Sequence, residues 1–189
     1  VIVVIAAMIC VWRFGAVGTD VQPAGILFTE LSNYVRWITL SVGTLLLLAN
    51  WHVPADGEQG EYFGMVLCSM AGVMLTASAN DLVVLFFALE LVSVPTYVLV
   101  ALSRTDQRST EGALKYFFLG AFSAAITVYG FSFLYGVSGS TIMEVGPGKS
   151  LASFFAAHGA SSNYALIGLV LAMSGLLFKV AAVPFHAYA

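Results

Sequence analysis

The stretch LVVLFFALELVSVPTYVLVAL, residues 82–102, is apolar over almost its whole length and carries one ionisable residue, Glu90. A helix rises about 1.5 Å per residue, so about twenty residues cross the roughly 30 Å hydrocarbon core of a bilayer. In lipid, each backbone N–H and C=O must be bonded within its own segment unless a barrel closes, and no alternating pattern of barrel strands is present. The stretch therefore predicts a transmembrane helix.

The composition of the whole chain agrees with that prediction. Of its 189 residues, 60% are hydrophobic and 9% are charged, which lies outside the range of soluble domains. A net charge of −3 offers nothing to nucleic acid. Cys10 and Cys68 lie in separate apolar segments without a CxxC or Cys/His partner, and there is no Gly-rich nucleotide loop. We expect a membrane protein with no metal site and no cofactor of its own.

Six apolar segments predict an all-α polytopic membrane protein with six transmembrane helices. They span residues 1–12, 34–50, 62–79, 82–103, 111–136 and 164–183. Small residues four positions apart, such as Gly120 with Ala124 and Gly168 with Ala172, would let helices approach closely in lipid. The chain starts at Val1 rather than Met and ends without a terminating pattern, so we expect it to be part of a longer protein.

The loops give a weak indication of orientation. Six helices place the 51–61 and 104–110 loops on one side of the membrane and the other loops on the opposite side. Arg104 and Arg108 favour the cytoplasm for the side of the 104–110 loop, because short cytoplasmic loops carry an excess of Lys and Arg.

Three charged residues lie inside the apolar segments at depths where hydrocarbon should exclude them. Glu90 is close to the middle of its segment, Lys179 is fifteen residues into the last segment, and Lys115 is about one turn inside the fifth. A charge at the bilayer centre costs about 2.5–3.5 kcal/mol or more, so such residues face the protein interior, pair with each other and mark ion paths. Glu90 could instead only hold helices together, and Lys115 is near enough to a helix end to extend to the headgroups.

Two prolines adjoin the central charges. Pro95 and Pro184 each remove an N–H and free the carbonyl four residues earlier, at Leu91 and Val180, and these residues directly follow the glutamate and the lysine. Discontinuous helices are where transporters place ion sites, so we expect helix breaks at both prolines. His186 follows Pro184 by two and is either a proton relay or a packing residue.

Three motifs resemble a known family. LELxSxP around Glu90, EGALKY around Lys115 and FKxxxVPFH from Lys179 to His186 resemble the antiporter-like membrane subunits of respiratory complex I, most closely the subunit N/subunit 2 family of NADH-quinone oxidoreductase. The sister subunits L and M carry a tryptophan where this chain has Leu89. The family continues WxPDxY after the histidine, whereas this chain ends in AYA.

The resemblance implies a place for each charge. Glu90, Lys115 and Lys179 look like the glutamate of the family's fifth helix and the lysines of its sixth and its broken seventh helix. The six helices would be the second to seventh of about fourteen, in a fold built from inverted repeats. Residues 1–61 would then be N-terminal transmembrane helices, and residues 62–189 an incomplete first antiporter-like repeat.

The function implied by the resemblance is that of a proton-translocating subunit of an enzyme complex in the bacterial inner membrane. NADH, FMN, iron–sulfur clusters and quinone would be bound by other subunits, and the partners would be membrane subunits of the M, L, K, J, A and H types. A subunit of a multisubunit sodium/proton antiporter or of a membrane-bound hydrogenase is the alternative, since these share the same charges. A scaffold whose charges only lock helices together is a third possibility.

We further expect Glu90 and Lys179 to act as a coupled pair, with the glutamate setting the proton affinity of the lysine. Straight helices would place the two charges at heights that differ by about 10 Å. Long side chains and helix tilt could close that gap, so their contact is a hypothesis at this stage.

Overall fold

The computed structural model describes residues 2–14, 25–50, 59–102, 107–144, 149–159 and 162–183. Seven α-helices account for most of these residues, and two isolated β-bridges, Ile26 with Ala79 and Asp81 with Ile142, join connecting segments. The helices are α1 (Ile2–Phe14), α2 (Glu30–Ala49), α3 (Gln59–Thr76), α4 (Leu82–Leu102), α5 (Gln107–Ser138), α6 (Leu151–His158) and α7 (Asn163–Lys179). The predicted all-α class is confirmed.

Each of the six predicted segments coincides with a helix, but not every helix has the length of a membrane span. Among the described residues, three helices are long and apolar enough to cross a membrane: Glu30–Ala49, Leu82–Leu102 and Thr110–Ser138. The apolar parts of α3 and α7 are shorter. The prediction of six transmembrane helices is therefore supported for three, and the count of six stays a prediction.

Helix α6 was not predicted from the sequence. It is only eight residues long, and it begins at a capping box in which Ser150 and Ser153 each accept a hydrogen bond from the other's backbone N–H. Such a cap starts a helix by satisfying free N–H groups, without any long apolar pattern. The apolar pattern of the sequence was therefore too short to reveal this helix.

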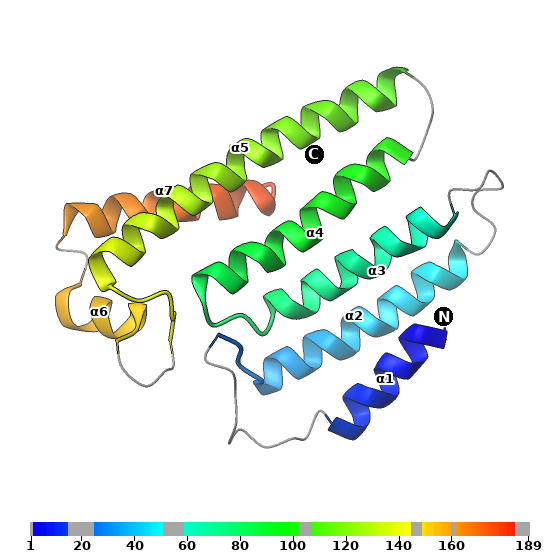
Figure 1. Cartoon of the computed structure of the whole chain (residues 1–189), viewed down its shortest axis with the longest axis horizontal. Coiled ribbons are helices and arrows are strands. Elements are labelled where there is room, and N and C mark those ends of the chain that lie inside the picture. The colour runs from blue at the N-terminus through cyan, green and yellow to red at the C-terminus, as the bar shows by residue number, and fades with distance from the viewer. Residues whose placement is uncertain are drawn as a thin grey trace.

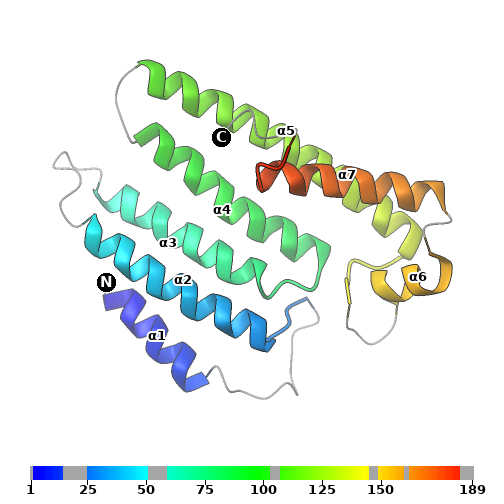
Figure 2. The ribbon, with the colours of Figure 1, turned by 180° about the vertical axis from the view of Figure 1, so that it is seen from behind.

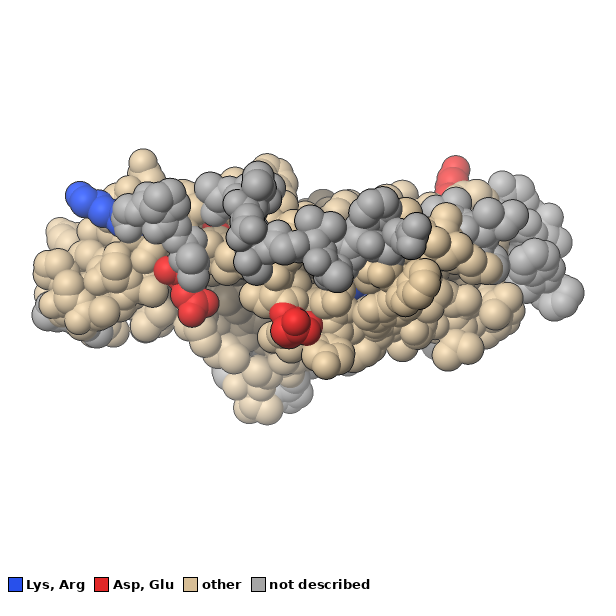
Figure 3. All heavy atoms as spheres, turned by 90° about the horizontal axis from the view of Figure 1, so that it is seen from below, with Lys and Arg blue, Asp and Glu red and all other residues tan. Residues whose placement is uncertain are grey.

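Helices α1 to α5 lie side by side in the order of the chain (Figure 1). Each packs on the next, and α7 packs along α5 rather than following on from α6 in the row, as the view from behind also shows (Figure 2). The face shown in Figure 3 carries few charged groups among the described residues. Large apolar side chains are exposed on α2 and α5, as expected of surfaces in contact with lipid: Leu31, Ile38, Leu45, Phe118 and Phe122.

The contact between α5 and α7 depends on small residues. A Cβ on Gly168 of α7 would come within 2.9 Å of the Phe133 Cβ and 3.1 Å of the Leu134 nitrogen on α5. Ala172, one turn later, is buried and packs with Phe131 and Leu134. The expected close approach at this pair is confirmed, and its cause is that lipid provides no hydrophobic drive between helices, so they associate through tight packing.

The start of α4 is fixed by two polar side chains. Asp81 caps the helix by accepting from the N–H groups of Val83 at 2.7 Å and Val84 at 3.3 Å, and its second oxygen accepts from the Thr141 hydroxyl. Asn80 is 2% exposed and accepts from the backbone N–H of Glu144 through its side chain. These bonds satisfy helix N–H groups and tie the connection after α5 to the beginning of α4.

Candidate functional site

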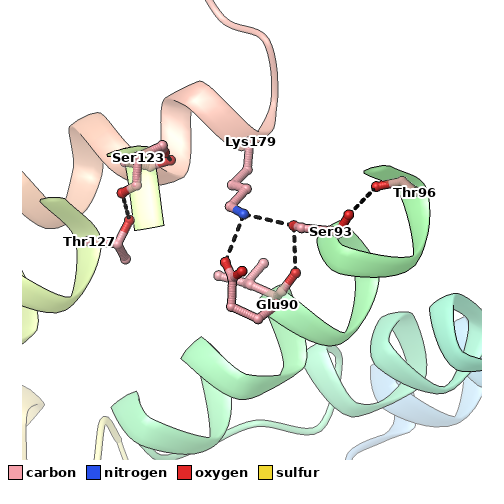
Figure 4. Close-up of polar contacts among 8 residues, drawn as sticks. Glu90, Ser93, Thr96, Ser123, Thr127 and Lys179 are labelled. Carbon is pink, nitrogen blue, oxygen red and sulfur yellow. Dashed lines mark hydrogen bonds and ion pairs between the residues drawn. The ribbon is translucent and has the colours of Figure 1, made fainter. Parts of the chain in front are cut away.

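The structure brings Glu90 and Lys179 together, from α4 and α7. Lys179 Nζ lies 2.9 Å from Glu90 Oε1 and 2.7 Å from Ser93 Oγ (Figure 4). The lysine side chain is 15% exposed and the glutamate side chain 23% exposed. The contact that the sequence left as a hypothesis is therefore present, and a third residue, Ser93, takes part in it.

The helix α4 presents this site on one face. Glu90 and Ser93 are three residues apart, which places their side chains next to each other on a helix. The Ser93 hydroxyl also donates to the Leu89 carbonyl at 2.7 Å, and the Thr96 hydroxyl donates to the Ser93 carbonyl at 2.7 Å (Figure 4). Sequence reasoning assigned no role to Ser93, although its spacing from Glu90 could have indicated one.

Pro95 does not break α4, contrary to the prediction. The helix runs from Leu82 to Leu102 with Pro95 inside it, and the proline is buried. A proline removes a single N–H, and membrane helices tolerate the loss because neighbouring groups satisfy the freed carbonyls. The glutamate is therefore held by a continuous helix.

The end of α7 lies five residues before Pro184, the position predicted for the other break. Helix α7 ends at Lys179, whereas the apolar segment extends to residue 183. The N–H of Ala181 donates to the Phe178 carbonyl at 2.9 Å, and the N–H of Ala182 donates to the Leu177 carbonyl at 3.0 Å. With Ala181 at φ 53°, these two bonds form the turn that commonly closes a helix. Apolar character alone does not reveal such an end.

Lys179 is consequently the last residue of its helix, where a positive charge interacts favourably with the helix dipole. The two other residues predicted at this end, Pro184 and His186, lie outside the described residues. Their roles as helix break and proton relay stay predictions.

The attraction between Glu90 and Lys179 is similar in size to the cost of removing both charges from water. At 2.9 Å, an effective dielectric of about 20 gives roughly 6 kcal/mol of attraction between Glu90 and Lys179. Removing two charges from water costs several kcal/mol per ion, so the net gain from forming such a pair is small. Removing one partner alone leaves an uncompensated charge, which is the costly state.

A cavity of about 450 Å³ is lined in part by Lys179 and Ser93. Its walls come from α2, α3, α4, α5 and α7 and are largely apolar, with the Lys179 side chain and several hydroxyl groups among the lining. The hydroxyl groups belong to Thr76, Ser93, Thr96, Tyr97 and Tyr116. Polar groups that converge on an apolar cavity can bind water or a small ligand beside the lysine.

Lys115 is not part of this contact. It is 70% exposed and pairs at 2.5 Å with Glu111, which lies one turn earlier on α5. The helix begins at Gln107, so Lys115 lies about two turns inside it rather than one. The sequence missed the extra turn because polar residues outside the lipid form helix without an apolar pattern.

The resemblance of the EGALKY motif predicts that Lys115→Ala lowers proton pumping several-fold in a complex that still assembles, and that Lys115→Arg, which keeps the charge, is milder. The reason is the position of Lys115 in the EGALKY motif, since an exposed ion pair by itself contributes little. Pumping is measured in proteoliposomes, with assembly checked by native electrophoresis. Glu111→Gln is the matched control, because it removes the ion pair and keeps the lysine. If all three variants pump normally, Lys115 is only a surface residue.

Two buried hydroxyl groups on α5, those of Ser123 and Thr127, help to fix the last part of α7. Ser123 on α5 donates to the Gly175 carbonyl at 3.0 Å, and Thr127 donates to the Ser123 carbonyl at 2.9 Å (Figure 4). Gly175 lies one turn before Lys179, so this bond positions the backbone that carries the lysine. The spacing of Ser123 and Thr127 on one helix face was the available indication, and sequence reasoning did not use it.

Among the described residues, no group of three or more His, Cys, Asp or Glu side chains could hold a metal ion. The chemistry of the site is thus that of a carboxylate, an amine and hydroxyl groups. Such groups bind, hold and release protons.

Comparison with known proteins agrees with this arrangement. A family model described as NADH:quinone oxidoreductase/Mrp antiporter, TM, matches residues 79–189, which include α4, α5 and α7. The chain is 41% identical over 169 residues to NADH-quinone oxidoreductase subunit N of Rhodospirillum rubrum. It is 40% identical over 151 residues to NAD(P)H-quinone oxidoreductase subunit 2 of Crocosphaera subtropica.

These matches cover most of the chain but only part of the relatives. The match to the Rhodospirillum rubrum protein covers 87% of this chain and 34% of that protein, and the match to the Crocosphaera subtropica protein covers 79% and 28%. The chain therefore spans about a third of the length of the curated relatives it matches.

Solved structures share the fold. A chain of respiratory complex I from Thermus thermophilus with bound aureothin matches with a TM-score of 0.73 and 27% identity, over 98% of this chain and 38% of that chain. A chain of an archaeal membrane-bound sulfane sulfur reductase matches with a TM-score of 0.76, and its 21% identity supports the fold alone. The chain belongs to the NADH:quinone oxidoreductase/Mrp antiporter transmembrane family, with sequence similarity to the antiporter-like subunit N of complex I.

Proposed function

We propose that the chain is a proton-translocating part of the membrane arm of a bacterial NADH-quinone oxidoreductase. The observation that carries the proposal is the ion pair between Glu90 of α4 and Lys179 of α7, in two apolar helices. Buried ionisable residues within membrane segments mark ion paths by default. The family and the names of the relatives support the same function.

The residues of this chain would act by exchanging protons at the Lys179 amine. While Glu90 is ionised, it stabilises the ammonium; when Glu90 gains a proton or moves away, the ammonium loses its counter-charge and releases its proton. The adjoining cavity of about 450 Å³ has room for several water molecules, which would carry that proton. No redox step would take place in this chain.

The rest of the complex follows from the same proposal. Other membrane subunits, of the M, L, K, J, A and H types, would adjoin this one in the inner membrane, and NADH, FMN, iron–sulfur clusters and quinone would be bound elsewhere. Residues 1–61 and 62–189 would be the N-terminal helices and the incomplete first repeat of an antiporter-like subunit with about fourteen helices. Residues 104–110, the last of which form the start of α5, would face the cytoplasm, since they include Arg104 and Arg108.

The proposal is tested by purifying the affinity-tagged full-length protein from its native membrane and identifying its partners by mass spectrometry. We expect NADH-oxidising and quinone-binding subunits to co-purify, and NADH to drive proton uptake into proteoliposomes containing the complex. A complex that exchanges sodium for protons without oxidising NADH would show instead a subunit of a multisubunit antiporter. A complex that evolves hydrogen would show a membrane-bound hydrogenase.

A further inference from the structure

Ser93 is the second acceptor of the Lys179 ammonium, and the mechanism above does not require it. Its Oγ lies 2.7 Å from Lys179 Nζ, against 2.9 Å for Glu90 Oε1. Ser93 is 7% exposed. The lysine therefore reaches from α7 to two different groups on α4, one charged and one neutral.

The direction of the Ser93 hydroxyl determines which state of the lysine it favours. A hydroxyl has one donor and two lone pairs, and the donor of Ser93 is directed to the Leu89 carbonyl at 2.7 Å. The Ser93 hydroxyl can therefore only accept a hydrogen bond from Lys179. An ammonium donates more strongly than a neutral amine, so the acceptor at Ser93 favours the protonated lysine.

We propose that Ser93 is a positioning residue that holds the Lys179 ammonium on α4 while Glu90 is protonated. The inference rests on the proposed function and adds one step to it. When the carboxylate takes up a proton, the ammonium loses its counter-charge but keeps the Ser93 oxygen as a neutral acceptor. The lysine thus stays in place, beside the cavity, until its proton leaves.

Few other groups around the lysine can titrate. Among the described residues that line the cavity or contact Lys179, α4 contributes Glu90 and Tyr97, and α5 contributes Tyr116. The parts of α2 and α3 that line the cavity contribute apolar and hydroxyl side chains. A change in pH dependence on loss of the Ser93 hydroxyl would therefore report on the lysine and its carboxylate, since a free tyrosine side chain titrates only near about pH 10.

The test is the pH profile of NADH-driven proton pumping by the reconstituted complex. In Ser93→Ala we expect the alkaline limb, where the lysine no longer holds a proton, to move to lower pH by about one unit, because a hydrogen bond to a charged group is lost. Ser93→Thr keeps the hydroxyl, so its profile should match the wild type. Ser174→Ala on α7 is the control, because that hydroxyl bonds the Leu171 carbonyl of its own helix.

An unchanged alkaline limb in Ser93→Ala overturns the proposal, and so does an equal shift in Ser93→Thr, which would indicate packing rather than the hydroxyl. Ser93→Cys, of nearly native volume and with a weak acceptor, replaces Ser93→Ala if the alanine complex does not assemble. If neither assembles, Ser93 is structural and the proposal is wrong. Lys179→Ala in the same experiment separates the two claims: normal pumping there overturns the proposed function, whereas lost pumping with a normal Ser93→Ala profile overturns only the role of Ser93.

Discussion

We expect proton pumping by the assembled complex to fall at least tenfold when Glu90 is replaced by glutamine, and about as far when Lys179 is replaced by alanine, because each change should cost more than about 1.4 kcal/mol in the transfer step. Glutamine has the shape of glutamate without its charge, so the ammonium 2.9 Å away loses its counter-charge. Glu90→Asp keeps the charge on a shorter side chain and should retain part of the pumping. The measurement is NADH-driven acidification of proteoliposomes, normalised to the amount of assembled complex.

The double variant is the decisive case. If Glu90 and Lys179 act as one unit, Glu90→Gln with Lys179→Ala should be little worse than either single change, because the second change removes an interaction that is already lost. Glu61→Gln, the same substitution at an exposed position in the first turn of α3, is the control and should pump normally. Effects on the activation free energy that simply add in the double variant would show that the two residues work independently, and the mechanism would be wrong.

Gly175→Ala is expected to lower proton pumping nearly as far as the changes at Glu90 and Lys179, although glycine carries no functional group. A Cβ at this position would overlap the Thr127 hydroxyl and come within 2.9 Å of the Ser123 carbonyl oxygen. Both lie on α5, and the Ser123 oxygen belongs to the helix backbone, so we expect α7 to shift away and take Lys179 with it. Overpacking of this kind costs about 1–3 kcal/mol, which we expect as a lower unfolding temperature of the complex.

Two further variants separate the clash from other causes. Gly136→Ala on α5 is the matched control, because a Cβ there would meet nothing within 4 Å, and it should leave pumping and stability near normal. Thr127→Ala combined with Gly175→Ala removes the hydroxyl that the new methyl group would overlap, so it should recover part of the pumping. Normal pumping in Gly175→Ala would show that the tight α5–α7 contact does not position the lysine.

The sequence by itself determined the class of the protein and the residues that matter most for the proposal. Because hydrocarbon forces each segment to satisfy its own backbone hydrogen bonds, apolar segments of sufficient length can be recognised as helices one at a time. The cost of burying charge in the same segments singled out Glu90 and Lys179 before any neighbour was known. The polar connections were less informative, and α6 and the extra turn of α5 before Lys115 were missed there.

Only the tertiary structure decided which of these groups meet. From the sequence, Glu90 and Lys179 were about 10 Å apart in height, and they are in contact at 2.9 Å because α7 packs along α5 and directs its last residue towards α4. The apolar pattern likewise did not show three other features of the site. These are the end of α7 at Lys179, the continuity of α4 through Pro95 and the contact of Ser93 with the lysine. That pattern records exposure to lipid within one helix, whereas contacts between helices depend on their lateral order and on small residues that allow close approach.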